Sequence, residues 1–365
     1  MPVLSLLDPI LRKEGMFKYL KHPLNLATMV LLLPLHALHA QTTGPRDSPK
    51  QESLKEEKRW DSPERLAALR VQLFLDKEGF GPGKIDGRWG GFSAKAAERW
   101  NGSDKEIKIE ASPEEMLDPS KIKKVPFSDE LLKDYEITQA DKSLLGTLPG
   151  KPSEQAKLKS MPYKTLMEVV AEKFHADPGF LLEINELKSG ADLEMGMTLK
   201  VPNVTEPFDI SEPMTLAKEK DKPSETTGEE TPIELIVLRG VRIVEVRKEG
   251  KLIHSFPISP GARDNQSPAG DWEVSVISWM PEFRWDRSML ENGRRSDNSF
   301  LLPPGPNNPV GIVWIGLSAD GIGLHGTSSP DAIGRNSSHG CIRLSNWDAL
   351  KLGKLVTVGV KVTIK

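Results

Sequence analysis

The patterned apolar residues of this chain fall into three stretches, and long charged segments separate them. Only 38% of the 365 residues are hydrophobic, whereas 28% are charged. That content is low for one compact core and favours small domains joined by polar linkers. A net charge of −3 is not the clearly basic balance of a nucleic-acid-binding protein, so no nucleic-acid partner is expected.

The first forty residues are laid out like a secretory signal peptide. Basic residues precede a largely apolar run over 24–38, and small residues suited to cleavage follow it. Pro34 interrupts the run, which is also short for a membrane span of roughly 20 residues. We expect 1–40 to direct export and to be removed, leaving no membrane span; an uncleaved anchor is the alternative. Met1 and Met16 are both possible starts.

Residues 61–101 predict two short helices around a glycine-rich turn at 79–90. Ser62 is suited to cap the first helix, because Pro63 follows at the first helical position and leucines then recur at helical spacing. Ser93 is the candidate cap of the second helix.

This turn reads Gly-Phe-Gly-Pro-Gly-Lys-Ile-Asp-Gly-Arg-Trp-Gly. It resembles the signature of the peptidoglycan-binding module, Gly-x-x-Pro-Gly-x-Ile-Asp-Gly-x-x-Gly. The resemblance implies a small α-helical module that binds peptidoglycan, although the third helix of that family is not evident after Trp100. An unrelated helical hairpin is the alternative.

Three segments are charged and lack a periodic apolar pattern. Residues 41–60 predict a disordered spacer, and residues 102–158 predict a poorly structured connector with a short helix near 129–135. Residues 205–231 contain several prolines among charged residues and predict a linker.

Residues 159–204 predict a strand, two helices and a strand. Two of its segments, 165–174 and 193–202, resemble the LysM signatures Thr-Leu-x-x-Ile-Ala-x-x-Phe and Leu-x-x-Gly-x-x-Leu-x-Val-Pro. This resemblance implies a βααβ module that binds glycans containing N-acetylglucosamine. The usual Gly-Asp before the first Thr-Leu is replaced by Tyr163-Lys164, a departure that bears on sugar affinity more than on fold.

The last stretch, 232–365, predicts a mainly-β domain. Strand candidates with alternating apolar residues follow one another with turn signals between them, and 345–352 is the main helix candidate, capped by Ser345 or Asn346. Many strands with little helix favour a β-sandwich-like or barrel-like sheet. The fold class expected for the whole chain is thus multidomain, with two small modules before a β domain.

Cys341 is the only cysteine, and it stands in Ser338-His339-Gly340-Cys341. A lone thiol on an exported chain cannot form an internal disulfide and is exposed to oxidation, so its presence needs a reason. A second histidine, His325, lies upstream, and a thiolate with an imidazole to take its proton is the minimum for nucleophilic catalysis. A buried, inert cysteine is the alternative.

The order of these residues closely resembles the YkuD-type catalytic domain of L,D-transpeptidases. That family has a histidine, some fourteen to seventeen residues, and then Ser/Thr-His-Gly-Cys; here fifteen residues separate His325 from Cys341. Residues 256–261 and 267–270 also resemble its Pro-x-x-x-Gly and Thr-Pro-x-Gly segments.

The resemblance assigns a role to each site residue. It implies Cys341 as the nucleophile and His325 as its general base. His339 and Gly340 would shape the site, where backbone N–H groups form an oxyanion hole. The remaining implied residues contact substrate or support the others: Arg343 for a substrate carboxylate, Ser338 beside His339, and Gly326, whose carbonyl would orient the base.

The implied reaction is acyl transfer on peptidoglycan. The thiolate attacks the third residue of a tetrapeptide stem, the terminal D-alanine leaves, and an amine of a neighbouring stem resolves the thioester into a 3-3 cross-link. Attack by water would make the same site an L,D-carboxypeptidase, and a protein amine or a free D-amino acid are further acceptors. A non-catalytic scaffold and a papain-like protease are the rivals, but the latter requires its histidine far downstream of the cysteine.

The sequence predicts no metal or cofactor, since none of the remaining histidines, His36, His39 and His254 among them, has metal-ligand spacing to another. We expect a protein of the periplasm or cell wall whose partners are the peptide stems and glycan strands of peptidoglycan. Its oligomeric state is left open.

Overall fold

The computed structural model describes residues 59–110, 118–122, 125–128, 130–219, 233–261, 267–335 and 340–365. The predicted signal peptide and nearly all of the predicted spacer lie outside these residues, so both stay predictions. The chain divides into two units, 1–47 and 48–365, and the description below concerns the second. No helix in the described ranges is both long and apolar enough to cross a membrane.

The C-terminal domain is mainly β, as expected. Its eight-stranded sheet has the order β11-β10-β9-β6-β12-β3-β4-β5. In chain order these strands are β3 (Ile233–Leu238), β4 (Ile243–Lys248), β5 (Lys251–Pro257), β6 (Gly270–Trp279), β9 (Val313–Leu317), β10 (Gly323–His325), β11 (Ile342–Arg343) and β12 (Lys361–Ile364). Neighbours are antiparallel except for β12 with β3 and β10 with β11, which are parallel.

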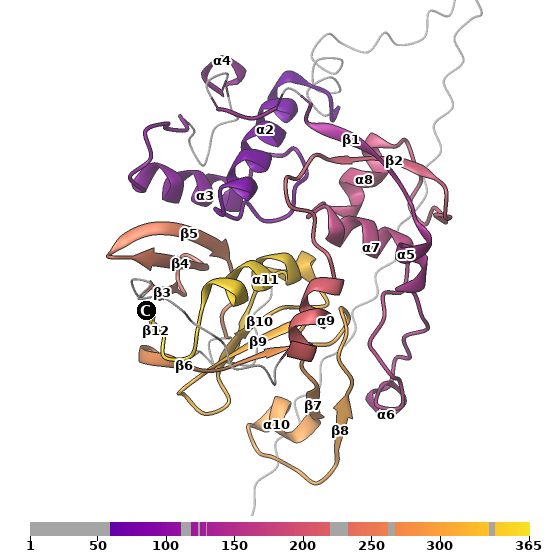
Figure 1. Ribbon diagram of the computed structural model, residues 1–365, viewed down its shortest axis with the longest axis vertical. Coiled ribbons are helices and arrows are strands. Elements are labelled where there is room, and N and C mark those ends of the chain that lie inside the picture. Colours follow the sequence, from indigo (N-terminus) through magenta and orange to yellow (C-terminus); the bar gives the residue numbers. More distant parts are fainter. Residues whose placement is uncertain are drawn as a thin grey trace, which may run out of the picture. The chain divides into compact units, whose positions relative to one another are not determined.

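The two ends of this sheet share one hydrophobic core. Val244 of β4 and Leu324 of β10 both belong to it, together with Trp347 and Leu352 of helix α11 (Asn346–Leu355). Helix α11 lies against β9 and β10 (Figure 1). Hydrogen bonds connect all eight strands into one continuous sheet. A sandwich would instead have two separate sheets. A hairpin of β7 (Phe283–Asp286), α10 (Arg287–Asn292) and β8 (Ser299–Leu302) extends from it.

The first module has the two helices that the sequence predicts. Helix α2 (Pro63–Lys77) begins after Ser62, whose side chain accepts the N–H of Arg65. Helix α3 (Gly91–Gly102) begins earlier than expected, with Gly90 as its N-cap. Ser93 therefore lies inside the helix, where its hydroxyl accepts a hydrogen bond from Gln72. Short helix α4 (Pro119–Ile122) follows.

A second module has the βααβ order, but its first strand is not where the sequence placed it. Strand β1 (Leu132–Glu136) pairs with β2 (Thr198–Pro202) around helices α7 (Leu166–Lys173) and α8 (Pro178–Ile184). The predicted connector therefore contains this strand, and the helix expected near 129–135 is wrong. Two short helices, α5 (Gln139–Ser143) and α6 (Pro152–Gln155), lie between β1 and α7. The strand reads Leu-Lys-Asp-Tyr-Glu, so its pairing with β2 outweighs its weak local signal.

These modules pack together instead of being joined only by polar linkers. Helix α2 places Leu69 and Leu73 in the core of the βααβ module and Phe74 in the core that it shares with α3. The glycine-rich turn forms hydrogen bonds with both the βααβ module and the C-terminal domain. The N–H of Ile85 donates to the carbonyl of His175 at 2.8 Å, and the N–H of Gly81 donates to the carbonyl of Ser255 in β5 at 2.7 Å.

The predicted linker 205–231 also begins with folded residues. Phe208 and Ile210 enter the core of the C-terminal domain, and helix α9 (Ser211–Lys218) follows them and contacts β6. Residues 220–232 lie outside the described ranges.

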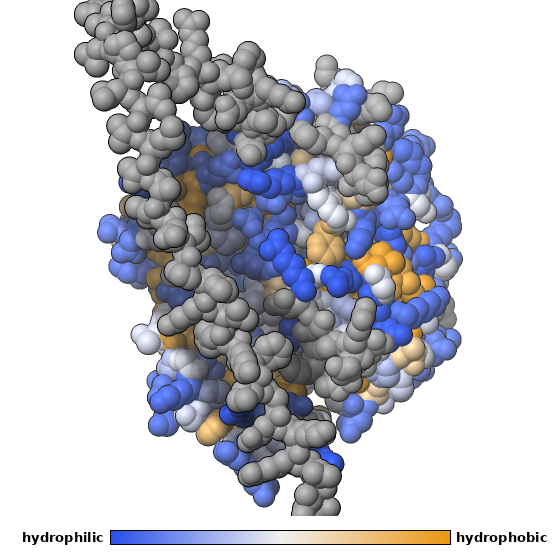
Figure 2. Space-filling view, turned by 180° about the vertical axis from the view of Figure 1, so that it is seen from behind, coloured by the Kyte–Doolittle hydropathy of each residue, from blue (hydrophilic) through white to orange (hydrophobic). Residues whose placement is uncertain are grey.

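The surface seen from behind is mostly hydrophilic, with small apolar areas between charged side chains (Figure 2). The exposed large apolar side chains come from several different elements: Met195, Met197, Met214, Val276, Met289, Leu301 and Val358.

Candidate active site

The candidate active site lies where the short parallel strands β10 and β11 meet. Leu324 pairs with Ile342 and His325 pairs with Arg343. Both Leu324 and Ile342 are fully buried in the core. Because side chains alternate along a strand, His325 and Arg343 lie on the opposite face, and Cys341, two residues before Arg343, lies on that same face.

His325 is held in its neutral form. Its Nδ1 lies 2.6 Å from the carbonyl oxygen of Gly326, which can only accept, so Nδ1 carries the proton and Nε2 keeps its lone pair. Burial lowers the pKa of His325 to about 4, and the positive charge of Arg343 acts in the same direction. The ring is therefore neutral near pH 7 and able to accept a proton.

The indole ring of Trp314 packs against the face of the His325 imidazole. The ring of Trp314 on β9 stacks on His325 at 5.6 Å between centroids. Glycines make room for the indole, because a Cβ on Gly323 would lie 2.7 Å from it and one on Gly316 would lie 2.9 Å from it. An alanine at either position would displace Trp314 and thereby loosen the base.

Cys341 carries a thiol that is half-buried beside the same strands. Its Sγ lies 3.5 Å from the carbonyl oxygen of Gly321. Burial raises the pKa of the thiol, whereas the backbone N–H of Gly323 and the charge of Arg343 lower it in part. With its pKa raised, the thiol of Cys341 is neutral near pH 7, as is His325, whose pKa is lowered.

The backbone before Cys341 is held by a residue that the sequence analysis did not single out. Gly340 has φ +119°, a region that favours glycine, and its carbonyl accepts a 2.7 Å hydrogen bond from the buried hydroxyl of Ser267. The N–H of Gly261 donates to that hydroxyl at 3.3 Å. Both residues belong to the two segments noted upstream, so the motif was visible in the sequence but its role was not.

Arg343 is anchored through its backbone, which exchanges two hydrogen bonds with Ser259, at 2.9 and 3.0 Å. Its guanidinium is half-buried on the face of His325 and Cys341. Ser338 and His339 lie outside the described residues, so their expected roles stay predictions. Of the predicted site residues, His325, Gly326, Gly340, Cys341 and Arg343 come together.

Asn346 and Glu172 were also missed as site residues. A Cβ on Gly326 would lie 2.2 Å from Oδ1 of the buried Asn346, so the amide lies directly against the residue that orients the base. The Asn346 side chain donates to Glu172 of α7 at 2.9 Å, and Glu172 also accepts from the hydroxyl of Tyr163. The sequence presented Asn346 only as a helix cap, a place that Ser345 takes.

Comparisons with known proteins agree with this geometry. Residues 234–364 match the family model of YkuD, the L,D-transpeptidase catalytic domain. The putative L,D-transpeptidase YkuD of Bacillus licheniformis is 26% identical over 203 residues, which cover 56% of this chain and 94% of that protein. A putative L,D-transpeptidase from the ATP synthase subunits region of Fuscovulum blasticum is 43% identical over 109 residues, 30% of this chain and 56% of that protein.

Among solved structures, an L,D-transpeptidase from Mycobacterium smegmatis aligns with 36% of this chain and 58% of its own, at 19% identity and a TM-score of 0.30. Similarity that low carries no argument about function. The family match and the curated relatives do: the C-terminal domain is an L,D-transpeptidase catalytic domain, and the enzyme class predicted from the cysteine motif is confirmed.

Proposed function

We propose that this chain is an exported enzyme that forms 3-3 cross-links in peptidoglycan through a thioester at Cys341. The observation that carries the proposal is the hydrogen bond from Nδ1 of His325 to Gly326, which leaves Nε2 to act as a base on the face that holds the thiol. The match of 234–364 to the L,D-transpeptidase domain supports a peptide-stem substrate.

The first half-reaction is acylation. His325 takes the thiol proton as Sγ of Cys341 bonds to the carbonyl carbon of the third stem residue. Backbone N–H groups at Gly340 and Cys341 stabilise the oxyanion. The C–N bond then breaks, D-alanine leaves with the proton from His325, and a thioester remains.

In the second half-reaction an amine of another stem attacks the thioester. His325 takes a proton from that amine, the C–S bond breaks, and the thiolate is protonated again as the amide cross-link is released. Arg343 would hold a carboxylate of a stem, because a guanidinium can form two parallel hydrogen bonds with it. Water as the acceptor gives the L,D-carboxypeptidase alternative. The module 61–101 and the LysM-like module would retain the enzyme at the cell wall.

The test uses the full chain with purified tetrapeptide muropeptides, with products identified by mass. We expect a cross-linked dimer and released D-alanine, and the Cys341→Ala variant should give neither. A carbapenem should add once to Cys341, and His325→Ala should slow that acylation by roughly a hundredfold. Trimmed stems without dimers would favour the carboxypeptidase.

An unmodified mass after long exposure to the carbapenem, in a protein whose thiol still reacts once unfolded, would contradict the mechanism. That result would favour the alternative hypothesis, a non-catalytic scaffold that binds peptidoglycan.

A further inference from the structure

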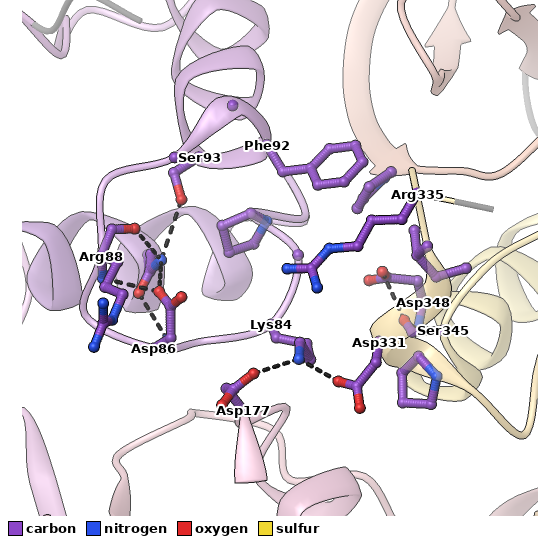
Figure 3. Close-up of a pocket in the computed structure, with 18 of the residues that line it drawn as sticks. Lys84, Asp86, Arg88, Phe92, Ser93, Asp177, Asp331, Arg335, Ser345 and Asp348 are labelled. Carbon is purple, nitrogen blue, oxygen red and sulfur yellow. Dashed lines mark hydrogen bonds and ion pairs between the residues drawn. The ribbon is translucent and has the colours of Figure 1, made fainter. Parts of the chain in front are cut away.

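A pocket of about 200 Å³ lies where the glycine-rich turn meets the catalytic domain. Its walls come from that turn and the start of α3, from the segment after β10, and from the start of α11 (Figure 3). Neither His325 nor Cys341 lines it, so within the described residues it is separate from the active site.

One wall of the pocket offers a carboxylate that lacks a donor. Asp348 is 1% exposed, and its Oδ2 accepts a 2.7 Å hydrogen bond from Ser345. Its Oδ1 is buried with no hydrogen-bond partner among the described residues, and Figure 3 shows the carboxylate directed into the pocket. A buried carboxylate oxygen without a donor is costly, so a ligand with an N–H group would stabilise it.

A cation enters the pocket from the segment after β10. Figure 3 shows the guanidinium of Arg335 extending between the walls. Lys84, below it, already forms ion pairs with Asp177 and Asp331. Arg335 is therefore the cation best placed to receive an anion, and a guanidinium fits a carboxylate well.

The pocket has room for a small ligand. Its volume of about 200 Å³ is sufficient for a molecule the size of an amino acid. Phe92 and Trp347 line it as well and give an apolar surface for a short side chain.

We propose that this pocket binds the zwitterionic head of an amino acid, with its ammonium on Asp348 and its carboxylate on Arg335. The identity of the ligand rests on the proposed function, because both sources belong to the cell wall. A free D-amino acid carries this head, and so does the side chain of a stem whose diamino acid is diaminopimelate. In either case the pocket anchors the ligand, and no bond reacts there.

The protonation of Asp348 predicts that the affinity of the pocket for its ligand depends on pH. Burial raises its pKa to about 7; Lys351 and the Ser345 hydroxyl act to lower the pKa, and Asp76 acts to raise it. An ammonium pairs only with the ionised carboxylate, so affinity should increase as pH rises from about 6 to about 8.

Binding is measured by calorimetry on the full chain carrying Cys341→Ala, which prevents turnover. The probes are D-alanine, meso-diaminopimelate and a purified tetrapeptide stem. D-lactate, which lacks the ammonium, and D-alaninol, which lacks the carboxylate, are the controls. We expect both controls to bind at least about tenfold more weakly than D-alanine, as loss of one charge-assisted hydrogen bond predicts.

Asp348→Asn keeps the bond to Ser345 and should weaken binding about tenfold while removing its pH dependence. Arg335→Gln should weaken it similarly, and Arg287→Gln, an exposed arginine paired with Glu291, should not. Binding of the stem but not of D-alanine would identify the stem as the source, and the reverse would identify a free amino acid.

Equal affinity for D-alanine and D-lactate, or no heat with any zwitterion at millimolar concentration, would overturn the proposal. Carbapenem acylation of the chain with its native thiol separates this failure from that of the proposed function. If the enzyme is acylated but the pocket binds no zwitterion, only the pocket proposal fails. If the pocket binds but no acylation occurs, only the proposed cysteine chemistry fails.

Discussion

At the scale of single residues, the protonation of two groups decides how this site works. Burial lowers the pKa of His325 and favours its neutral form, although the hydrogen bond from Nδ1 to the carbonyl of Gly326 raises the pKa in part. The thiol of Cys341 has a raised pKa for the same reason, burial. In the proposed mechanism the thiol therefore stays protonated until a carbonyl group arrives, because the sulfur gains charge only as His325 takes its proton.

The depressed pKa of His325 predicts an unusually low acid limit for acylation. A histidine with the ordinary pKa of about 6.5 would lose its base form below pH ~6. Here the pKa is about 4, so the carbapenem acylation rate should stay level down to pH ~5 and decline only as pH approaches 4. The rate is measured by intact mass between pH 4 and 8 on protein shown to be folded. A decline centred near pH 6.5 would mean that the base is exposed.

At the scale of elements, the hydroxyl of Ser267 links the segment before β6 to Gly340, the residue before Cys341. Ser267→Ala would remove the hydroxyl that donates to the carbonyl of Gly340, at a cost of about 0.5–1.5 kcal/mol. We expect acylation to slow by roughly tenfold or more, because the N–H groups beside Cys341 would no longer be fixed.

A conservative variant and a matched control separate an effect on acylation from a general loss of stability. Ser267→Thr keeps the hydroxyl and should restore the rate. Ser255→Ala removes another buried serine whose hydroxyl has no hydrogen-bond partner within the described ranges, so it should change neither rate nor stability. If Ser267→Ala lowers the melting temperature but acylates like the parent, Ser267 only stabilises the fold.

These elements also show how far sequence reasoning reaches. The cysteine, the histidine and the mainly-β domain were predictable because motif spacing and strand alternation are local signals. Strand β1 was missed because it exists through its pairing with β2, more than sixty residues away. Asn346 was recognised only as a cap, because its contact with Gly326 depends on how α11 packs against β10.

At the scale of the whole molecule, the upstream modules are part of the support of the active site. The bond from Asn346 to Glu172 links the residue beside Gly326 to helix α7 of the βααβ module. Lys84 of the glycine-rich turn likewise reaches the segment that leads to Cys341, by a bond to the side chain of Asp331. We therefore expect substitutions at this junction to alter acylation.

Glu172 makes that expectation measurable. Burial raises its pKa to about 7, the charge of Glu168 raises it further, and bonds from Tyr163 and Asn346 lower it in part. The folded chain thus holds a proton that the unfolded chain releases at its ordinary pKa near 4.5, so this group's contribution to stability declines as pH rises from about 4.5 to about 7 and is level above that. Glu172→Gln cannot ionise, so its advantage over the parent should grow through that window.

The measurement is urea unfolding of both proteins between pH 5 and 8. Both proteins contain His325 and Asp348, so the contributions of these groups cancel in the difference. Glu172→Gln can still accept the bond from Asn346 and should acylate at the parent rate. Glu172→Ala leaves that amide only its longer bond to the carbonyl of Pro306, at 3.3 Å, and should acylate more slowly at every pH. The matched control is Glu168→Gln, which removes a nearby charge but leaves the bond to Asn346 in place. A difference in stability that does not change with pH would show that Glu172 is ionised in the fold, and equal acylation by the alanine variant would show that the upstream module does not support the site.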